Sequence, residues 1–308
     1  MVLPFDNLNR DQTQDYFCDG LTSDITTDLS KFSNLLVIAS NTAFTYKGRA
    51  VKIQDVSRDL NVRYVLEGSV QKAADRVRVN AQLIDGASGH HVWAERFDRP
   101  ISDLLDVQDD IIHRIVSALA VRLTMLERER VMQKNPVDPT AYELYLQGVH
   151  AYSLEDRGKF EQCRKLFELA TELDPSFARA WGYLSYMTAR GAVLGWLPAL
   201  AMAEAEILAK KAIQLDPYDY ANYWDMAFIH FHRERYNQAI EEYEKALRLN
   251  SNDADLLAEV ADLYTSLGQC EKAIDQIEML CASTQMSPTC IDGTWVGHCT
   301  MPGSMIEP

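Results

Sequence analysis

A 34-residue repeat constrains this chain more than any other feature of its sequence. The segments 222–249 and 257–277 each have the pattern of two consecutive helices, and a shift of 34 residues superimposes them. Ala239 then coincides with Ala273, and large apolar residues coincide around this pair. Small residues recur where two antiparallel helices approach closely. The spacing therefore predicts helix pairs that stack, because one pair alone cannot bury its apolar faces.

This pattern resembles the tetratricopeptide repeat, and four units can be placed. The first unit begins at Ala141, and the second contains Trp181 and an insertion around 191–198. The two segments above form the third and fourth units. The resemblance implies an all-α solenoid over residues 135–280. Stacks of this kind present extended binding surfaces, so the repeats indicate protein binding rather than catalysis.

The charge of the chain is unevenly distributed. The net charge is -15 over 308 residues. Residues 1–134 hold 17 Lys and Arg against 19 Asp and Glu, a balance of -2. Residues 135–308 hold 13 against 26, a balance of -13. An acidic helical half repels phosphates, so we expect no nucleic-acid partner.

No apolar run in the sequence approaches the ~20 residues that cross a bilayer. Met1 leads directly into a short apolar segment, so no signal peptide is predicted. We therefore expect a cytoplasmic protein without a membrane segment in this chain. A periplasmic location stays open if a membrane helix precedes Met1 in a longer parent.

The first 134 residues predict an α+β domain with the order β-α-β-α-β-β-β-α. Spacings of three and four, two-residue alternation and short apolar runs define its elements. A run of prolines and polar residues at 135–139 marks the expected boundary with the repeats. The expected strands are 2–5, 35–39, 62–71, 76–84 and 91–97, and the expected helices are 11–32, 51–60 and one from Ser102 onward, capped by Ser102 or Asp103.

Several motifs of this domain resemble the TolB-amino-terminal-like (FlgO-like) domain. They include Val2-Leu-Pro-Phe-Asp-Asn, Tyr16-Phe-Cys-Asp-Gly-Leu, Arg63-Tyr-Val-Leu-Glu-Gly-Ser-Val and Trp93-Ala-Glu-Arg-Phe-Asp. In bacterial, especially rhizobial, signalling proteins, that domain lies between a class III adenylate/guanylate cyclase or winged-helix domain and tetratricopeptide repeats. The resemblance covers roughly residues 2–280. It implies that this chain is truncated at its start, inside the first strand and without an output domain.

Residues 281–308 lack a helical period, and we expect an irregular, disordered tail there. Residues 279–297 can be reverse-translated into codons that encode a further repeat when they are read in the neighbouring frame. The Ala and Pro of that repeat then stand where the 34-residue period requires them. A frameshift near Glu278 is therefore our hypothesis for this tail. The last helix would then lack a capping helix, which predicts self-association through the uncapped repeat.

The sequence holds no catalytic motif. It has no phosphate-binding loop, no HExxH and no GxSxG, and nothing resembles the paired metal-binding aspartates of a class III cyclase. His90 and His91 are neighbours on an expected strand, so they point to opposite faces and cannot share an ion. We therefore expect no enzyme activity, no catalytic residue, no cofactor and no metal.

The candidate site is the inner face of the repeats. In tetratricopeptide arrays the second, fifth, ninth and twelfth positions of each first helix tend to line a concave groove. Aromatic residues there would bind an extended peptide, and the row turns acidic at its far end. The alternative is that they pack against the amino-terminal domain or a neighbouring helix. The candidates are Tyr142, Tyr145, Tyr152, Tyr186, Trp224, Phe228, Phe231, Asp255 and Asp262.

These observations predict a non-catalytic protein- or peptide-interaction module of a bacterial signalling protein. Two alternatives remain. The chain could be the regulatory portion of an adenylate/guanylate cyclase polypeptide that lacks its catalytic domain. It could also be a small-molecule sensor that holds its ligand between the two domains.

Overall fold

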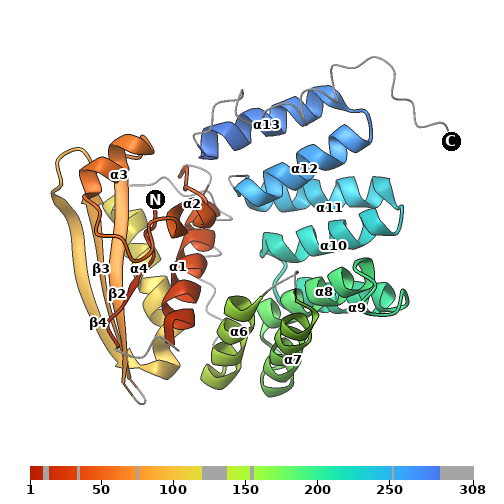
Figure 1. The fold of residues 1–308 in the computed structure, drawn as a ribbon, viewed down its shortest axis with the longest axis horizontal. Helices are drawn as coiled ribbons and strands as arrows, with labels where there is room; N and C mark the ends of the chain where they lie inside the picture. Colours follow the sequence, from red (N-terminus) through yellow and green to blue (C-terminus); the bar gives the residue numbers. More distant parts are fainter. Residues whose placement is uncertain are drawn as a thin grey trace.

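A computed structural model describes residues 1–9, 14–32, 35–73, 76–119, 137–152, 156–251 and 253–284. A sheet with its helices forms one side of the molecule, and a stack of helix pairs forms the other (Figure 1). None of the helices in these ranges is both long and apolar enough to cross a membrane.

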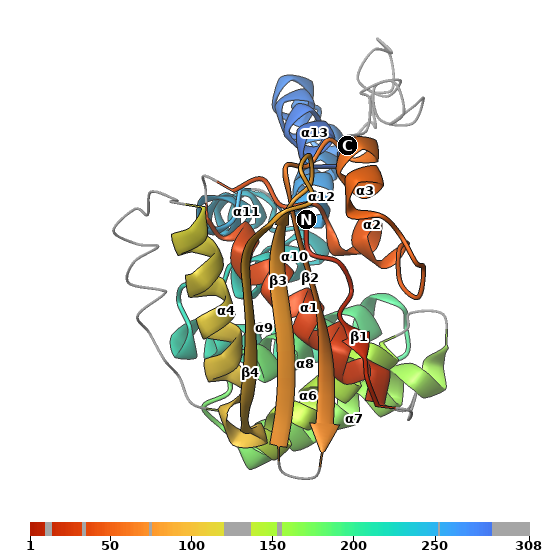
Figure 2. The same cartoon turned by 90° about the vertical axis from the view of Figure 1, so that its left-hand side faces the viewer.

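The sheet has four strands in the order β1-β2-β3-β4. They are β1 (Asp6–Asn7), β2 (Tyr64–Ala73), β3 (Arg76–Asp85) and β4 (His91–Pro100). β1 lies parallel to β2, and the other neighbours are antiparallel. Val77, Val79 and Leu83 of β3 are buried, as their alternation with polar residues predicts. The sheet therefore buries one face, and no described helix crosses the face of β2–β4 turned to the viewer in Figure 2.

Two helices, α1 (Asp15–Ser30) and α4 (Leu104–Ala118), cover the inner face of the sheet. Leu21 and Ile25 of α1 and Ile111 of α4 are fully buried in the same core. The 3₁₀ turn η2 (Ile101–Asp103) leads into α4. Asp103 occupies the N-cap position of α4, one of the two positions predicted, but its side chain accepts no capping hydrogen bond from the helix.

The strand predicted at 35–39 is also wrong, because these residues form no strand. Ile38 is buried and Leu36 is 54% exposed, so the segment is an apolar crossover without strand pairing. Val2 bridges Leu66, and β1 pairs with β2, on the side of β2 away from β3. Short apolar runs do not distinguish a strand from a buried connection. The crossover leads to α2 (Ser40–Phe44), which the sequence did not predict, and α3 (Ile53–Asp59), which it did.

Four helix pairs follow, in agreement with the four predicted units. Ala227, Ala239, Ala261 and Ala273 are all buried at the contacts between helices, so small residues stand where helices approach. The pairs are α6 (Pro139–Ala151) with α7 (Arg157–Leu173), α8 (Ala178–Val193) with α9 (Ala201–Leu215), α10 (Tyr220–His232) with α11 (Tyr236–Leu249), and α12 (Ala254–Ser266) with α13 (Cys270–Thr284). α13 thus extends past the predicted end of the repeats at residue 280. The predicted tail beyond Thr284 and the predicted boundary at 134–135 lie outside the described residues.

Helix α1 joins the two parts of the molecule. It packs against α6, and Gly20 permits the approach, since a Cβ atom there would lie 2.4 Å from Cδ2 of Leu146. Tyr16 donates a hydrogen bond to Glu143 at 2.7 Å on one flank of this contact. A single hydrophobic cluster runs from Val2 through the sheet to Met187 in α8. The amino-terminal part and the first repeats therefore share one core.

Candidate functional site

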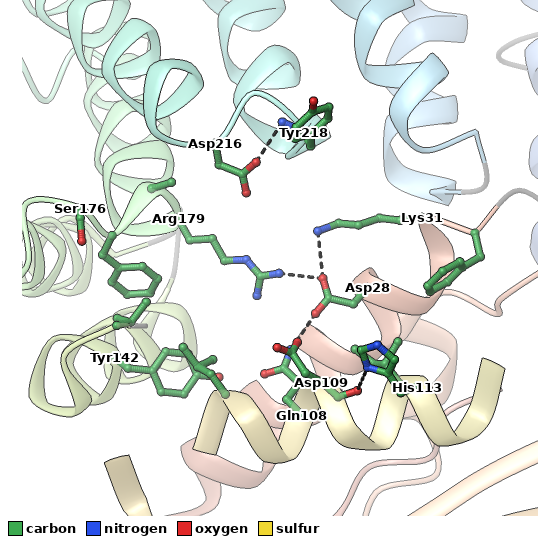
Figure 3. Close-up of a pocket in the computed structure, with 16 residues that line it drawn as sticks. Asp28, Lys31, Gln108, Asp109, His113, Tyr142, Ser176, Arg179, Asp216 and Tyr218 are labelled. Carbon is green, nitrogen blue, oxygen red and sulfur yellow. Dashed lines mark hydrogen bonds and ion pairs between the residues drawn. The ribbon is translucent and has the colours of Figure 1, made fainter. Parts of the chain in front are cut away.

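Arg179, at the start of α8, holds the carboxyl-terminal half of α1 against the repeats. Its guanidinium lies 2.7 Å from Asp28 and 3.2 Å from Asp24, both of α1. It also lies 3.8 Å from Asp219, the residue that caps α10. The Arg179 side chain is only 21% exposed, so these pairs are largely withdrawn from water. Figure 3 shows Arg179 and Lys31 converging on Asp28.

Asp28 stays ionised in this contact. Burial by itself would raise its pKa, but Lys31 and Arg179 and the hydrogen bonds from Lys31 and Gln108 lower the pKa to about 2. Lys31 lies 2.9 Å from Asp28, and Nε2 of Gln108 donates to it at 2.8 Å. The carboxylate thus connects α1, α4 and the repeats.

Tyr142 and Tyr145, the first two candidates, belong to this contact. The Tyr142 hydroxyl donates to Asp24 at 2.7 Å, and both rings are buried in the shared core. Burial raises the pKa of the Tyr142 hydroxyl well above its ordinary value, and the Asp24 charge adds to this effect. Their placement matches the alternative of packing against the amino-terminal domain.

The middle candidates form one continuous cluster. The hydroxyl oxygens of Tyr152 and Tyr186 lie 2.9 Å apart, and the Tyr186 ring lies 6.2 Å from that of Phe228. Nε of Arg190 donates to the Tyr186 hydroxyl at 3.1 Å, and its guanidinium lies over the Phe228 ring at 4.5 Å. Phe228 is only 4% exposed, whereas Tyr152 and Tyr186 are partly exposed.

The remaining candidates separate into two places. Trp224 is partly exposed and stacks on Tyr220 with ring centroids 6.4 Å apart. Asp255 and Asp262 are exposed on α12. Phe231 instead packs beside the turn into α11, 5.8 Å from Tyr236.

Asp225 is a carboxyl group that the sequence reasoning missed. Burial raises its pKa well above the ordinary value, and the nearby charges of Asp219 and Glu259 raise it further, while Arg190 opposes them. Asp225 and Glu259 occupy the same position of successive units, 34 residues apart. Two acidic residues at the same position of successive repeats are the sequence signal that could have identified Asp225.

We name these residues of α6, α8, α10 and α12 the aromatic–acidic surface. Each of them is at least partly exposed, except Phe228, which is buried under the Arg190 guanidinium. Most of the charged side chains among them are carboxylates. The surface consists of Tyr152, Tyr186, Arg190, Trp224, Asp225, Phe228, Asp255, Glu259 and Asp262.

Two family models match the chain. Residues 1–117 match the second domain of HilA/YgeH-like transcriptional regulators, and residues 229–268 match the TPR repeat. The second match confirms tetratricopeptide repeats in the third and fourth units. The model that matches the amino-terminal residues carries another description than TolB-like, so that resemblance stays a prediction.

One curated relative is named putative adenylate cyclase 3, from Rhizobium meliloti (strain 1021). It is 46% identical over 217 residues, which cover 70% of this chain and 37% of the relative. The chain therefore spans little more than a third of the relative that it matches. This relationship supports the predicted link to adenylate cyclase-related proteins.

Two solved structures are similar to part of the chain. One is a thermophilic TPR protein of Thermus thermophilus, with 16% identity, a TM-score of 0.46, and coverage of 64% of this chain and 97% of that one. Another is MamA, with 20% identity, a TM-score of 0.36, and coverage of 47% and 74%.

The Arg179 contact generates a stability prediction. Arg179→Met should lower the free energy of unfolding by about 3–5 kcal/mol, because Asp24 and Asp219 would lose the buried cation that faces them and Asp28 would keep only Lys31. Urea unfolding monitored by circular dichroism measures the change. The control is Arg248→Met, whose guanidinium is 64% exposed and 3.9 Å from Glu244. It should cost less than about 1 kcal/mol. Equal losses in the two variants would contradict the role of Arg179.

Asp225 generates a pH-dependent prediction. Its pKa is raised in the folded protein, so above the unfolded value of about 3.9 its ionisation opposes folding. This cost is absent below that value, grows as the pH rises, and is constant above the folded pKa. Asp225→Asn should therefore raise the melting temperature, and by more at pH 7.5 than at pH 4.5.

The matched control is Asp275→Asn on α13, where the carboxylate is exposed. It should leave the melting temperature nearly unchanged at both pH values. A loss of stability in Asp225→Asn at pH 7.5 would show that the carboxylate is already satisfied in the folded chain.

Proposed function

We propose that this chain is a non-catalytic protein-interaction module of a bacterial signalling protein. It binds an extended peptide segment of its partner on the aromatic–acidic surface. The observation that carries the proposal is Asp225, a partly buried carboxyl whose pKa is raised by burial and by the facing charges of Asp219 and Glu259. A lysine or arginine side chain of a partner would supply the positive charge that this position needs.

The neighbouring aromatic residues supply the apolar part of the site. Trp224 precedes Asp225 and is partly exposed, and the partly exposed Tyr186 ring lies 6.2 Å from that of Phe228. Such rings bury a large area with few rotatable bonds, which favours them as anchors. We therefore propose a partner segment in which a basic residue lies beside a large apolar one.

The position of α1 supports this part of the repeats over the first unit. Tyr142 bonds to Asp24 of α1, and Tyr145 packs against Phe177 and Tyr183, so both buried rings are withheld from a partner. The surface from α8 to α12 remains for binding. Asp255 and Asp262 extend its negative charge along α12.

A cyclase-related setting is the second part of the proposal. The relative named putative adenylate cyclase 3 matches 70% of this chain at 46% identity. We propose that the chain acts as the regulatory portion of such a polypeptide. Its partner could then be a cyclase domain or a protein that controls one.

Two truncations test the peptide surface and should give different results. Trp224→Ala should weaken peptide binding by roughly thirtyfold, corresponding to about 2 kcal/mol, with little loss of stability. Phe228→Ala should cost about 3–5 kcal/mol of folding free energy, since its ring is buried. Melting curves separate the two effects.

The probe is a random 12-residue peptide library displayed on phage and selected on the immobilised full chain. We expect enrichment of peptides with Lys or Arg beside a large apolar residue. Fluorescence polarisation with one enriched peptide should give weaker binding for Trp224→Ala and Asp225→Asn than for Asp275→Asn. Enrichment of acidic peptides, or equal affinities of all three variants, would refute the proposal.

The absence of catalysis is tested separately. With ATP or GTP and Mn²⁺ or Mg²⁺, the purified chain should form no cyclic nucleotide, because no stretch of its sequence resembles the metal-binding core of a class III cyclase. Chromatographic detection of cyclic AMP and cyclic GMP measures this, and a known class III cyclase serves as the positive control. Turnover that follows this polypeptide through purification would overturn the non-catalytic assignment.

A further inference from the structure

Arg190 of α8 is the cation of the aromatic–acidic surface, and the fold leaves most of its hydrogen-bond donors unused. Its Nε donates to the Tyr186 hydroxyl at 3.1 Å, and its guanidinium lies 4.5 Å from the centroid of the Phe228 ring. Among the described residues, no carboxylate oxygen lies within 4.0 Å of its side-chain nitrogens. The N–H groups of Nη1 and Nη2 therefore have no acceptor in this part of the chain.

The two tyrosine hydroxyls beside Arg190 supply a further donor. The hydroxyl oxygens of Tyr152 and Tyr186 lie 2.9 Å apart, and only one of their protons lies in the bond between them. The other proton has no acceptor among the described residues, whichever tyrosine donates to the other. Burial raises the pKa of the Tyr152 hydroxyl above its ordinary value, so it stays protonated. This cluster thus holds more donors than the fold uses.

A partner can reach these donors, because Tyr152, Tyr186 and Arg190 are all partly exposed. The guanidinium is also held in place, since it lies over the buried Phe228 ring and its Nε is fixed by Tyr186. A planar guanidinium in a fixed position matches the geometry of a carboxylate. It also loses little side-chain freedom when it binds one.

The charges around Arg190 favour an oxyanion with a single negative charge. Asp225 and Glu259 lie near enough for their charges to interact with that of Arg190, and they repel any further negative charge. A phosphate group carries a charge of about −1.5 to −2 at neutral pH, whereas a carboxylate carries one charge. A basic residue that binds at Asp225 would reduce the repulsion. A carboxylate that arrives together with a basic residue therefore suits the site.

We propose that Arg190 and the tyrosine pair bind the side-chain carboxylate of an Asp or Glu in the partner's segment. This inference rests on the proposed function, because the carboxylate belongs to the same segment as the basic residue that binds at Asp225. The segment is therefore mixed in charge, with its carboxylate over α8 and the end of α6 and its basic residue over α10. Arg190 thereby fixes the register of the segment on the repeats.

The peptides enriched on the immobilised full chain provide the probes. Each is synthesised with acetylated and amidated ends, so that only side chains supply a carboxylate, and its Asp or Glu is replaced in turn by Asn or Gln. In fluorescence polarisation, one such replacement should weaken binding by about tenfold or more, because a charge-assisted hydrogen bond is lost. This comparison uses the unaltered protein, so it does not depend on the stability of a variant.

Arg190→Met should abolish the difference between the acidic peptide and its amide counterpart, since the group that distinguishes them is removed. Arg190→Lys should keep part of the difference, because it keeps the charge but not the planar fork. The control is Arg248→Met, whose guanidinium is 64% exposed on α11, and it should keep the full difference. Melting curves show whether each variant is folded.

The outcomes separate this inference from the proposed function. If Arg190 only compensates Asp225 and Glu259, then Arg190→Met should strengthen the binding of both peptide forms equally, and the inference is overturned. It is also overturned if the enriched peptides are basic and apolar without Asp or Glu, or if no replacement changes their affinity. In these cases the proposed function stands. A selection that enriches no peptide would refute both.

Discussion

The contact of α1 with the repeats is the interaction on which the rest of the structure depends. The hydrophobic cluster that begins at Val2 continues without a break to Met187, so apolar burial joins the sheet to the first two helix pairs. Burial of this kind is not directional. The Arg179 pairs with Asp24 and Asp28 provide the direction, because a shifted docking would leave those buried charges without partners.

This docking also decides which part of the repeats is free to bind a partner. An isolated array would present Tyr142 of α6, but α1 packs on this helix and Asp24 accepts the hydrogen bond of the Tyr142 hydroxyl. The exposed aromatic and acidic groups then begin at Tyr152 and extend to α12. α1 therefore takes the place of a ligand on the first unit, and the surface available to another protein lies further along the stack.

The helix pairs could be predicted from the sequence because their contacts join residues close in the chain. The site could be predicted only in part because its contacts join residues far apart in the chain. Pairs such as Ala239 and Ala273 record contacts between helices close in sequence, and the alternation in β3 records a sheet with one wet face. The role of Arg179 depends on Asp28, which is 151 residues away in the sequence. A local sequence pattern cannot predict a contact between residues so far apart. The strand expected at 35–39 failed similarly, because a strand needs a partner strand elsewhere in the chain and a short apolar run does not contain that information.

The acidity of the repeats has a local origin with a long-range consequence. Asp138, Asp219 and Asp253 accept hydrogen bonds from the first amides of α6, α10 and α12, which stabilises each helix start. The Asp219 cap also places negative charge beside Arg179, which pairs with two further carboxylates of α1. Arg179 and Lys31 compensate for that charge at the junction, but Asp225 and Glu259 lie beyond their contacts. Asp225 and Glu259 thus leave negative charge on the aromatic–acidic surface, and a basic partner segment is the chemistry that would neutralise it.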